Sequence, residues 1–168
     1  LYFKFGAMGS SKSAQALMTN FNYEEKNKNV FLMKPATDDR GDEVDEFGNV
    51  TAEVRSRIGL KAPAVTVSDN DNIIDMYLER DKKQKVDVII CDECQFLTEV
   101  QIEQMKDIAD MYDVPVLCFG LRADFRTRLF PGSKRLFEIA DSITEIKSIC
   151  RCGRKATVNA RLDGKGNI

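Results

Sequence analysis

Residues 6–13 read Gly6-Ala7-Met8-Gly9-Ser10-Ser11-Lys12-Ser13 and connect an apolar run, residues 1–5, to a stretch with helical periodicity. The pattern is close to the phosphate loop Gly-x-x-x-x-Gly-Lys-Ser/Thr. In that loop, backbone N–H groups and a helix N-terminus bind the phosphates of a nucleoside triphosphate. Lys12 would reach the outer phosphates, and the Ser13 hydroxyl would ligate Mg²⁺. We therefore expect a strand, a phosphate loop and a helix in this order.

One position departs from the motif, because Ser11 stands where the pattern has Gly. A Ser at this position must adopt a backbone geometry that Gly adopts freely, and it places a Cβ atom beside the nucleotide. The alternative interpretation is a Ser-rich helix cap followed by an unrelated Lys. The apolar run before the loop and the helical stretch after it favour the phosphate loop.

Strand-like and helix-like segments alternate along most of the chain. Apolar runs predict strands at residues 1–5, 30–33, 64–67, 86–91, 116–119 and 143–146. Helical spacing of apolar residues predicts three helices, and a fourth is expected at residues 134–140. Their apolar faces are Ala14, Leu17, Met18 and Phe21; Ile73, Ile74, Tyr77 and Leu78; and Ile102, Met105, Ile108, Ala109 and Tyr112. An acidic loop is expected at residues 37–51. This order predicts a parallel sheet covered by helices, with ligands bound at the carboxyl ends of the strands.

Asp92 and Glu93 follow directly after the apolar run of residues 86–91. An acid at such a strand end positions the Mg²⁺ ion of a phosphate-loop site, and a second acid can accept a proton from the attacking group. The alternative is a pair of solvated acids. We expect this strand to be a neighbour of the strand that leads into the phosphate loop.

Composition limits the classes of function. The chain has 168 residues, a formal net charge of -2 and a pI of about 5.4, with no basic stretch typical of a duplex-binding protein. It lacks a signal peptide and any apolar run approaching the roughly 20 residues of a membrane span, so we expect a cytoplasmic protein. There is no His, so a general base must be a carboxylate, Lys, Tyr or thiolate.

Five blocks resemble the thymidine kinase family, specifically the bacterial members of the zinc-containing type that the human cytosolic enzyme also represents. They are the phosphate loop, Ser56-Arg57-Ile58-Gly59-Leu60, Asp92-Glu93-Cys94-Gln95-Phe96, Gly120-Leu121-Arg122-Ala123-Asp124-Phe125-Arg126 and Ile149-Cys150-Arg151-Cys152-Gly153. The blocks occur in the family's order over almost the whole chain. The resemblance implies an ATP-dependent kinase that converts thymidine to its monophosphate for DNA synthesis.

The resemblance also implies an architecture. A RecA-like α/β domain with helices on both sheet faces would span residues 1–147, and a small zinc-bearing domain with a substrate-closing "lasso" loop would begin at residues 148–168. The family is usually homotetrameric and inhibited by thymidine triphosphate, and neither a membrane nor nucleic acid is an expected partner.

Residue roles follow from the same resemblance. Glu93 corresponds to the catalytic base, and Asp92 and Ser13 correspond to the Mg²⁺ contacts. The expected ATP and phosphate contacts are Gly6, Ala7, Met8, Gly9, Ser10, Ser11, Lys12, Ser13, Asp38, Arg40, Asp92 and Gln95. The expected residues around the thymidine base are Met8, Phe96, Leu121, Phe125 and Phe130.

Cys150 and Cys152 are the expected ligands of a structural Zn²⁺. A structural zinc site needs four ligands, so the resemblance implies two more beyond Ile168. The alternative is two free thiols on a surface turn. A hairpin is expected to start at residues 157–162.

Two other functions remain open at this level. A phosphate-loop ATPase or nucleotide-binding regulator would use the same loop and acids without a nucleoside acceptor, although the aromatic residues argue against it. A zinc-ribbon nucleic-acid module would use Cys150 and Cys152, although the acidic pI argues against it.

Overall fold

The computed structural model describes residues 1–38, 42–44 and 50–161, and every structural statement below refers to these residues. A parallel sheet of six strands has the order β10-β1-β9-β8-β2-β7. The strands of this sheet are β1 (Tyr2–Phe5), β2 (Val30–Pro35), β7 (Val65–Val67), β8 (Val88–Cys91), β9 (Val116–Gly120) and β10 (Ser142–Glu145). The helices are α1 (Lys12–Glu24), α2 (Ile73–Lys83), η1 (Cys94–Phe96), α3 (Glu99–Tyr112) and α4 (Pro131–Ile139).

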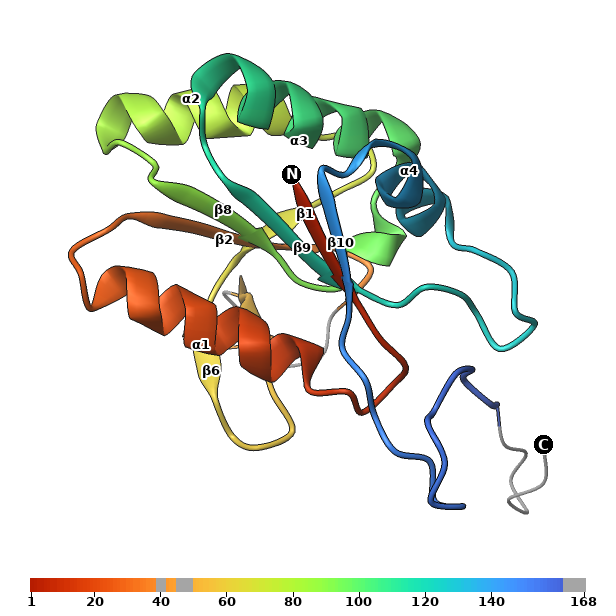
Figure 1. Ribbon diagram of the computed structural model, residues 1–168. Helices are drawn as coiled ribbons and strands as arrows, with labels where there is room; N and C mark the ends of the chain where they lie inside the picture. Colours follow the sequence, from red (N-terminus) through yellow and green to blue (C-terminus); the bar gives the residue numbers. More distant parts are fainter. Residues whose placement is uncertain (39–41, 45–49, 162–168) are drawn as a thin grey trace.

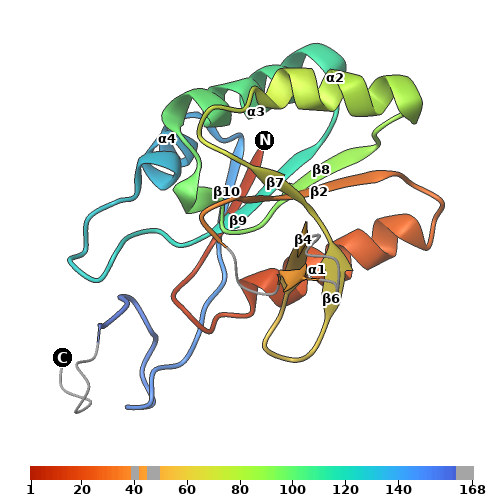
Figure 2. The same cartoon turned by 180° about the vertical axis from the view of Figure 1, so that it is seen from behind.

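Helices cover both faces of the sheet. Figures 1 and 2 show α1 on one face and α2, α3 and α4 on the other. Each face has its own apolar cluster. The cluster beneath α1 includes Leu17 and Phe119, and the cluster beneath α2 and α3 includes Phe31 and Met105. Strands β2 and β8 are buried along their whole length, as expected for central strands of a covered parallel sheet. The expected α/β fold of the RecA-like type is confirmed.

Two antiparallel hairpins were not predicted. The first pairs β3 (Glu43–Val44) with β4 (Val50–Thr51), within the segment expected to be an acidic loop. The second pairs β5 (Glu53–Arg55) with β6 (Lys61–Pro63), and β5 packs on α1. These strands are only two or three residues long, too short for an alternating pattern to be recognised.

The predicted apolar face of α1 was half wrong. Ala14 and Leu17 are buried, whereas the side chains of Met18 and Phe21 are 55% and 59% exposed. Lys12, Ala16 and Asn20 are buried instead, and Ala16 packs with Leu17 in the apolar cluster on this face of the sheet. The last predicted helix begins earlier than expected, with Pro131 in its first turn, a position that suits proline.

The strand before the phosphate loop, β1, and the strand before Asp92 and Glu93, β8, are not neighbours, contrary to the prediction, because β9 lies between them. All three strands are parallel, and Phe5 pairs with Gly120 while Cys91 pairs with Cys118. The phosphate loop, the segment after β9 and the acids after β8 therefore leave the sheet at the same edge. None of the described helices is long and apolar enough to cross a membrane.

Candidate active site

The phosphate loop connects β1 to α1 and contains two left-handed residues. Gly9 has φ 78°, and Ser11 has φ 63° and ψ 27°. Ser11 therefore has a backbone geometry that Gly adopts freely, as expected from the motif. The Ser11 side chain makes no capping hydrogen bond to α1, so no such bond offsets the strain of a Cβ atom in this conformation.

Lys12 is held inside this loop. Its Nζ atom donates to the carbonyl oxygens of Gly6 and Ala7 at 3.1 and 2.9 Å and to Ser10 Oγ at 3.4 Å. Burial lowers the pKa of Lys12, and the nearby Arg57 guanidinium lowers it further, whereas Glu93 and Asp92 act in the opposite direction. The ammonium group is thus placed between the loop backbone and the acids at the end of β8.

Asp92 is buried at the end of β8, where its backbone N–H donates to the Met33 carbonyl at 3.1 Å. Burial, with the charges of Glu93 and Asp38 as further causes, raises the pKa of Asp92 to about 6, while a side-chain hydrogen bond from Ser13 acts against this rise. Ser13, Asp38 and Asp92, three of the residues expected at the ATP site, therefore lie close together. Arg40 lies outside the described residues.

The Asp92 carboxyl is suited to a cation. Its Oδ1 atom is buried and has no hydrogen-bond partner among the residues that the structure describes. Such an atom is costly unless a ligand satisfies it, and carboxylate and hydroxyl oxygens are ligands that Mg²⁺ prefers. Asp92 and Ser13 therefore fit a Mg²⁺ ion that arrives with a nucleotide.

Glu93 also has a left-handed backbone, with φ 50° and ψ 34°. Its Oε2 atom accepts a hydrogen bond from Gln95 Nε2 at 2.5 Å. The other end of the same amide, Gln95 Oε1, accepts from the Leu121 backbone N–H at 2.9 Å. Gln95 is buried, and its amide connects Glu93 to the segment after β9.

The predicted base-binding residues fall into two groups. The rings of Phe96 and Phe130 meet edge to face at 5.5 Å, and Phe96 is partly exposed. Phe125 is exposed, with Arg126 and Arg161 over its ring at 5.2 and 5.7 Å. Ser133 Oγ donates to the Leu121 carbonyl at 2.5 Å, which fixes the start of the segment between these groups.

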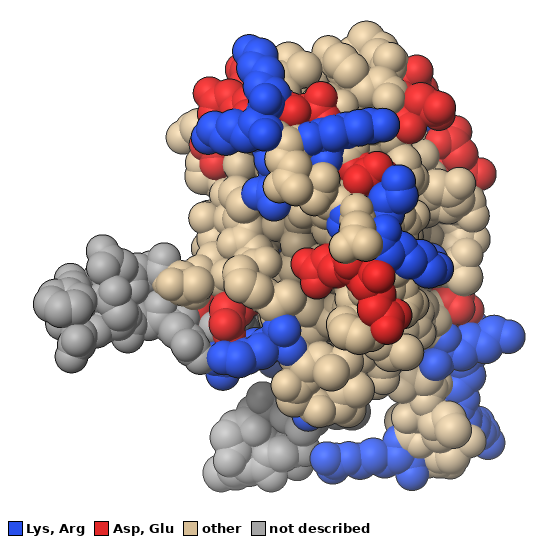
Figure 3. Space-filling view, turned by 90° about the vertical axis from the view of Figure 1, so that its left-hand side faces the viewer, with Lys and Arg blue, Asp and Glu red and all other residues tan. Residues whose placement is uncertain are grey.

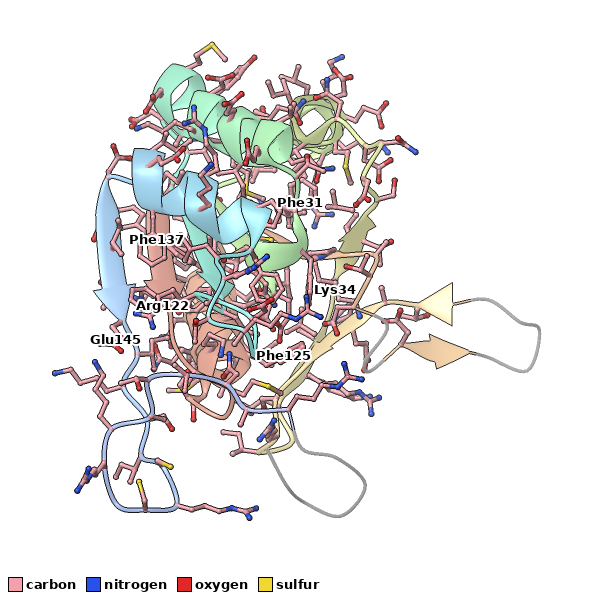
Figure 4. All side chains as sticks on the ribbon, turned by 90° about the vertical axis from the view of Figure 1, so that its right-hand side faces the viewer. Phe31, Lys34, Arg122, Phe125, Phe137 and Glu145 are labelled. Atoms are coloured by element: carbon pink, nitrogen blue, oxygen red, sulfur yellow. The ribbon has the colours of Figure 1, made fainter. Side chains whose placement is uncertain are left out.

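The segment after β10 returns to the phosphate loop. Met8 N–H donates to Asn159 Oδ1 at 2.8 Å, and Asn159 Nδ2 donates to the Ala123 carbonyl at 3.1 Å. Arg122 also donates to the Thr157 carbonyl at 3.2 Å. A pocket at this junction is lined by residues 5–7, 122–124 and 156–159 and by Glu145. Figure 4 shows Arg122, Phe125 and Glu145 near the carboxyl ends of the strands. Phe137, which belongs to α4, lies farther up in the same view.

Cys150 and Cys152 lie on an exposed turn closed by hydrogen bonds from Cys150 N–H to Arg154 and from Gly153 N–H to Cys150. Hydrogen bonds from Cys152 lower the pKa of the Cys150 thiol. Two adjacent thiols fit one edge of a zinc site. The described residues contain no group of three or more Cys, Asp or Glu side chains arranged to hold a metal. The described part of residues 157–162 does not form a strand.

Two residues at the site had no predicted role. Arg57 belongs to a block whose resemblance was noted, so a signal existed, but its sequence position gave no reason to place it at the phosphate loop. Asn159 lies outside every motif, and nothing in the sequence marked it.

On the face drawn in Figure 3, basic and acidic side chains are interspersed.

Comparison with known proteins identifies the family. The thymidine kinase family model matches residues 1–168. The chain is 41% identical over 168 residues to a thymidine kinase of Shewanella oneidensis, covering 100% of this chain and 83% of that protein. The chain belongs to the thymidine kinase family. A thymidine kinase of Rhodopirellula baltica is 38% identical, covering 100% of this chain and 76% of the relative.

The similarity to thymidine kinases covers all residues of the site. A thymidine kinase of Escherichia coli strain K12 is 40% identical over 166 residues, which cover 99% of this chain and 77% of that protein. Among solved structures, a Pif1 helicase from Candida albicans gives a TM-score of 0.48 at 16% identity, over 89% of this chain and 36% of the helicase. The matches to thymidine kinases include the phosphate loop, the acids after β8 and the segment after β9.

Proposed function

We propose that this protein is a thymidine kinase that transfers the γ-phosphoryl group of ATP to the 5′-hydroxyl of thymidine. The observation that carries the proposal is the convergence of Lys12, Asp92 and Glu93, from two non-adjacent strands, at one edge of the sheet. A cation and two carboxylates beside residues 6–13, in a chain of the thymidine kinase family, support this proposal. The product would enter DNA precursor synthesis in the cytoplasm.

The reaction assigns a role to each group. Glu93 takes the proton of the thymidine 5′-hydroxyl as the oxygen attacks the γ-phosphorus. The bond from that phosphorus to the bridging oxygen breaks, and ADP leaves. Lys12 exchanges its bonds with loop carbonyls for the outer phosphates and stabilises their charge. Gln95 holds the Glu93 carboxylate through its hydrogen bond, so the base is oriented before substrate binds.

Asp92 and Ser13 would hold Mg²⁺, which neutralises charge on the phosphate oxygens when bound. The edge-to-face pair of Phe96 and Phe130, with Phe125, Leu121 and Met8, would surround the thymine base. The loop residues 6–13, with Asp38 and Arg40, would contact ATP. We propose the same division of the chain as above, with residues 1–147 as the catalytic domain and a smaller domain from residue 148 onward.

An ATPase without a nucleoside acceptor is the alternative function. ADP release measured with and without thymidine separates the two. A thymidine kinase should release ADP at a rate that rises strongly with thymidine and should form thymidine monophosphate in equal amount. Release that is unchanged by thymidine, with no nucleotide product, would favour the ATPase.

We also propose the assembly and regulation that the family implies. Cys150 and Cys152 would supply two of the four ligands of a structural Zn²⁺ that anchors the substrate-closing loop. Met18 and Phe21 expose apolar surface on α1 that a second copy would cover in a homotetramer. Thymidine triphosphate would inhibit the enzyme. Sedimentation velocity tests the tetramer, and initial rates at increasing thymidine triphosphate test the inhibition.

A further inference from the structure

The β5–β6 hairpin brings a basic side chain to the phosphate loop. Its turn, residues 56–60, is closed by Ser56 N–H to the Leu60 carbonyl at 2.8 Å and by Leu60 N–H to Ser56 Oγ at 3.0 Å. The hairpin packs on α1 through β5, where Val54 is buried in the cluster beneath that helix. The turn is therefore anchored to α1, the helix that directly follows the phosphate loop.

Arg57, within this turn, lies against the loop. A Cβ atom added to Gly9 would stand 3.5 Å from Arg57 Nη1, so the guanidinium lies close to the loop backbone. Gly9 is in the part of the loop whose backbone surrounds the outer phosphates when a nucleotide is bound. The Arg57 guanidinium approaches that place from outside the loop, whereas Lys12 approaches it from within.

The other two cations of the hairpin are already engaged. Arg55 and Lys61 both pair with Glu53, at 3.0 and 3.4 Å. Among the described residues, no carboxylate forms an ion pair with Arg57 within 4 Å. Two cations, Lys12 and Arg57, therefore face one loop. The two positive charges repel each other. An anion between them would relieve that repulsion.

We propose that Arg57 binds the outermost phosphate of ATP and stabilises the charge of the phosphoryl group during transfer. The proposal rests on the proposed kinase function and adds a catalytic residue to it. The planar guanidinium suits two phosphate oxygens at once, which an ammonium group cannot match. An Arg in this position would act with Lys12 on the transferring group, and thymidine would bind independently of it.

Three variants test the role: Arg57→Ala, Arg57→Lys and, as the matched control, Lys61→Gln on the same hairpin. Affinities for a non-hydrolysable ATP analogue and for ADP are measured by calorimetry, and kcat is measured with thymidine. Arg57→Ala should lower kcat by about 10²-fold. It should weaken binding of the analogue by about tenfold or more and leave the affinity for ADP nearly unchanged, because only the analogue has the outermost phosphate. Arg57→Lys should recover part of both losses.

Two results would overturn the proposal: a kcat for Arg57→Ala close to wild type, or equal losses of affinity for ADP and the analogue. Melting temperatures identify a folding defect in Arg57→Ala. In that case kcat and the two affinities are compared between wild type and Arg57→Lys, because lysine retains the charge and most of the length. Failure of the kinase function itself looks different. The wild-type protein would then make no thymidine monophosphate, whereas the binding comparison would still report on Arg57.

Discussion

Glu93 follows β8 in a left-handed backbone conformation, and its carboxylate accepts a hydrogen bond from the Gln95 amide. In a chain without His, it is the best-placed group to take the proton of the thymidine hydroxyl. Glu93→Gln removes the base but preserves the shape, so turnover should fall by roughly 10²–10⁴-fold with little change in ATP affinity. Steady-state rates and calorimetry measure the two effects. Asp107→Asn, an exposed acid on α3, should be silent, and near-normal turnover in Glu93→Gln would refute the assignment.

Ser11 carries a Cβ atom at φ 63° without a capping bond. A left-handed residue with a Cβ costs roughly 1–2 kcal/mol, and the greater freedom of Gly in the unfolded chain offsets part of the gain from removing it. Ser11→Gly should therefore raise the free energy of unfolding by up to about 1 kcal/mol and tighten ATP binding or raise turnover. Ser11→Ala keeps the Cβ and should gain nothing. Equal behaviour of the two variants in denaturant titrations and kinetics would show that the loop tolerates Ser.

Asp92 makes stability depend on pH. Its pKa rises from 3.8 to about 6, mainly through burial. Over this interval the native carboxyl keeps a proton that the unfolded one has lost, so stability falls as pH rises. Asp92→Asn avoids this loss. Its advantage over wild type in urea unfolding, without Mg²⁺ or nucleotide, should grow from about pH 4 to pH 7 by up to ~3 kcal/mol. An advantage that does not change with pH would contradict the cause.

At the scale of elements, the contact between α4 and η1 orients the acid and the aromatic residues beside it. A Cβ atom at Gly132 would lie 2.7 Å from the carbonyl oxygens of Cys94 and Leu97. Both are backbone atoms, so Gly132→Ala must move α4 away from η1. We expect a loss of about 1–3 kcal/mol in stability. Turnover should fall as well, because η1 follows Glu93 directly.

Chemical denaturation and kinetics of Gly132→Ala measure both effects. Lys134→Ala, at an exposed position of the same helix, is the matched control and should stay within about 0.5 kcal/mol of wild type. An unchanged turnover in Gly132→Ala would mean that α4 does not orient the site.

At the scale of the whole molecule, the segment after β10 connects the phosphate loop to the segment after β9 through Asn159. If Cys150 and Cys152 hold zinc, the metal would stabilise this segment. Elemental analysis of the purified protein should find about one Zn²⁺ per chain. Removing it should weaken thymidine binding more than ATP binding, because the metal would anchor the loop that closes over thymidine, whereas the phosphate loop is formed chiefly by the junction of β1 and α1. Metal-free protein with full thymidine affinity would refute this role.

Local features of the site could be read from the sequence. The phosphate loop, the left-handed Ser11 and the acids after β8 each depend on a few consecutive residues. Backbone geometry, burial on both faces and turn chemistry act over that range. The same holds for the helices whose apolar spacing was regular, such as α3. The prediction for α1 was only half right, because Met18 and Phe21 fit the helical period but lie on a side that the sheet does not cover.

Other features depended on how distant segments pack. Nothing local indicated that β9 lies between β1 and β8, since strand order is a property of the whole sheet. Gln95 was expected among the ATP and phosphate contacts, and only the packing of distant segments shows that its amide also joins Glu93 to the Leu121 N–H. Arg57 and Asn159 reach the phosphate loop from segments about 50 and 150 residues away along the chain, through packing on α1 and the return of the chain after β10. Sequence patterns record the conformation of neighbours along the chain. They do not record which surfaces meet once apolar faces are buried against one another.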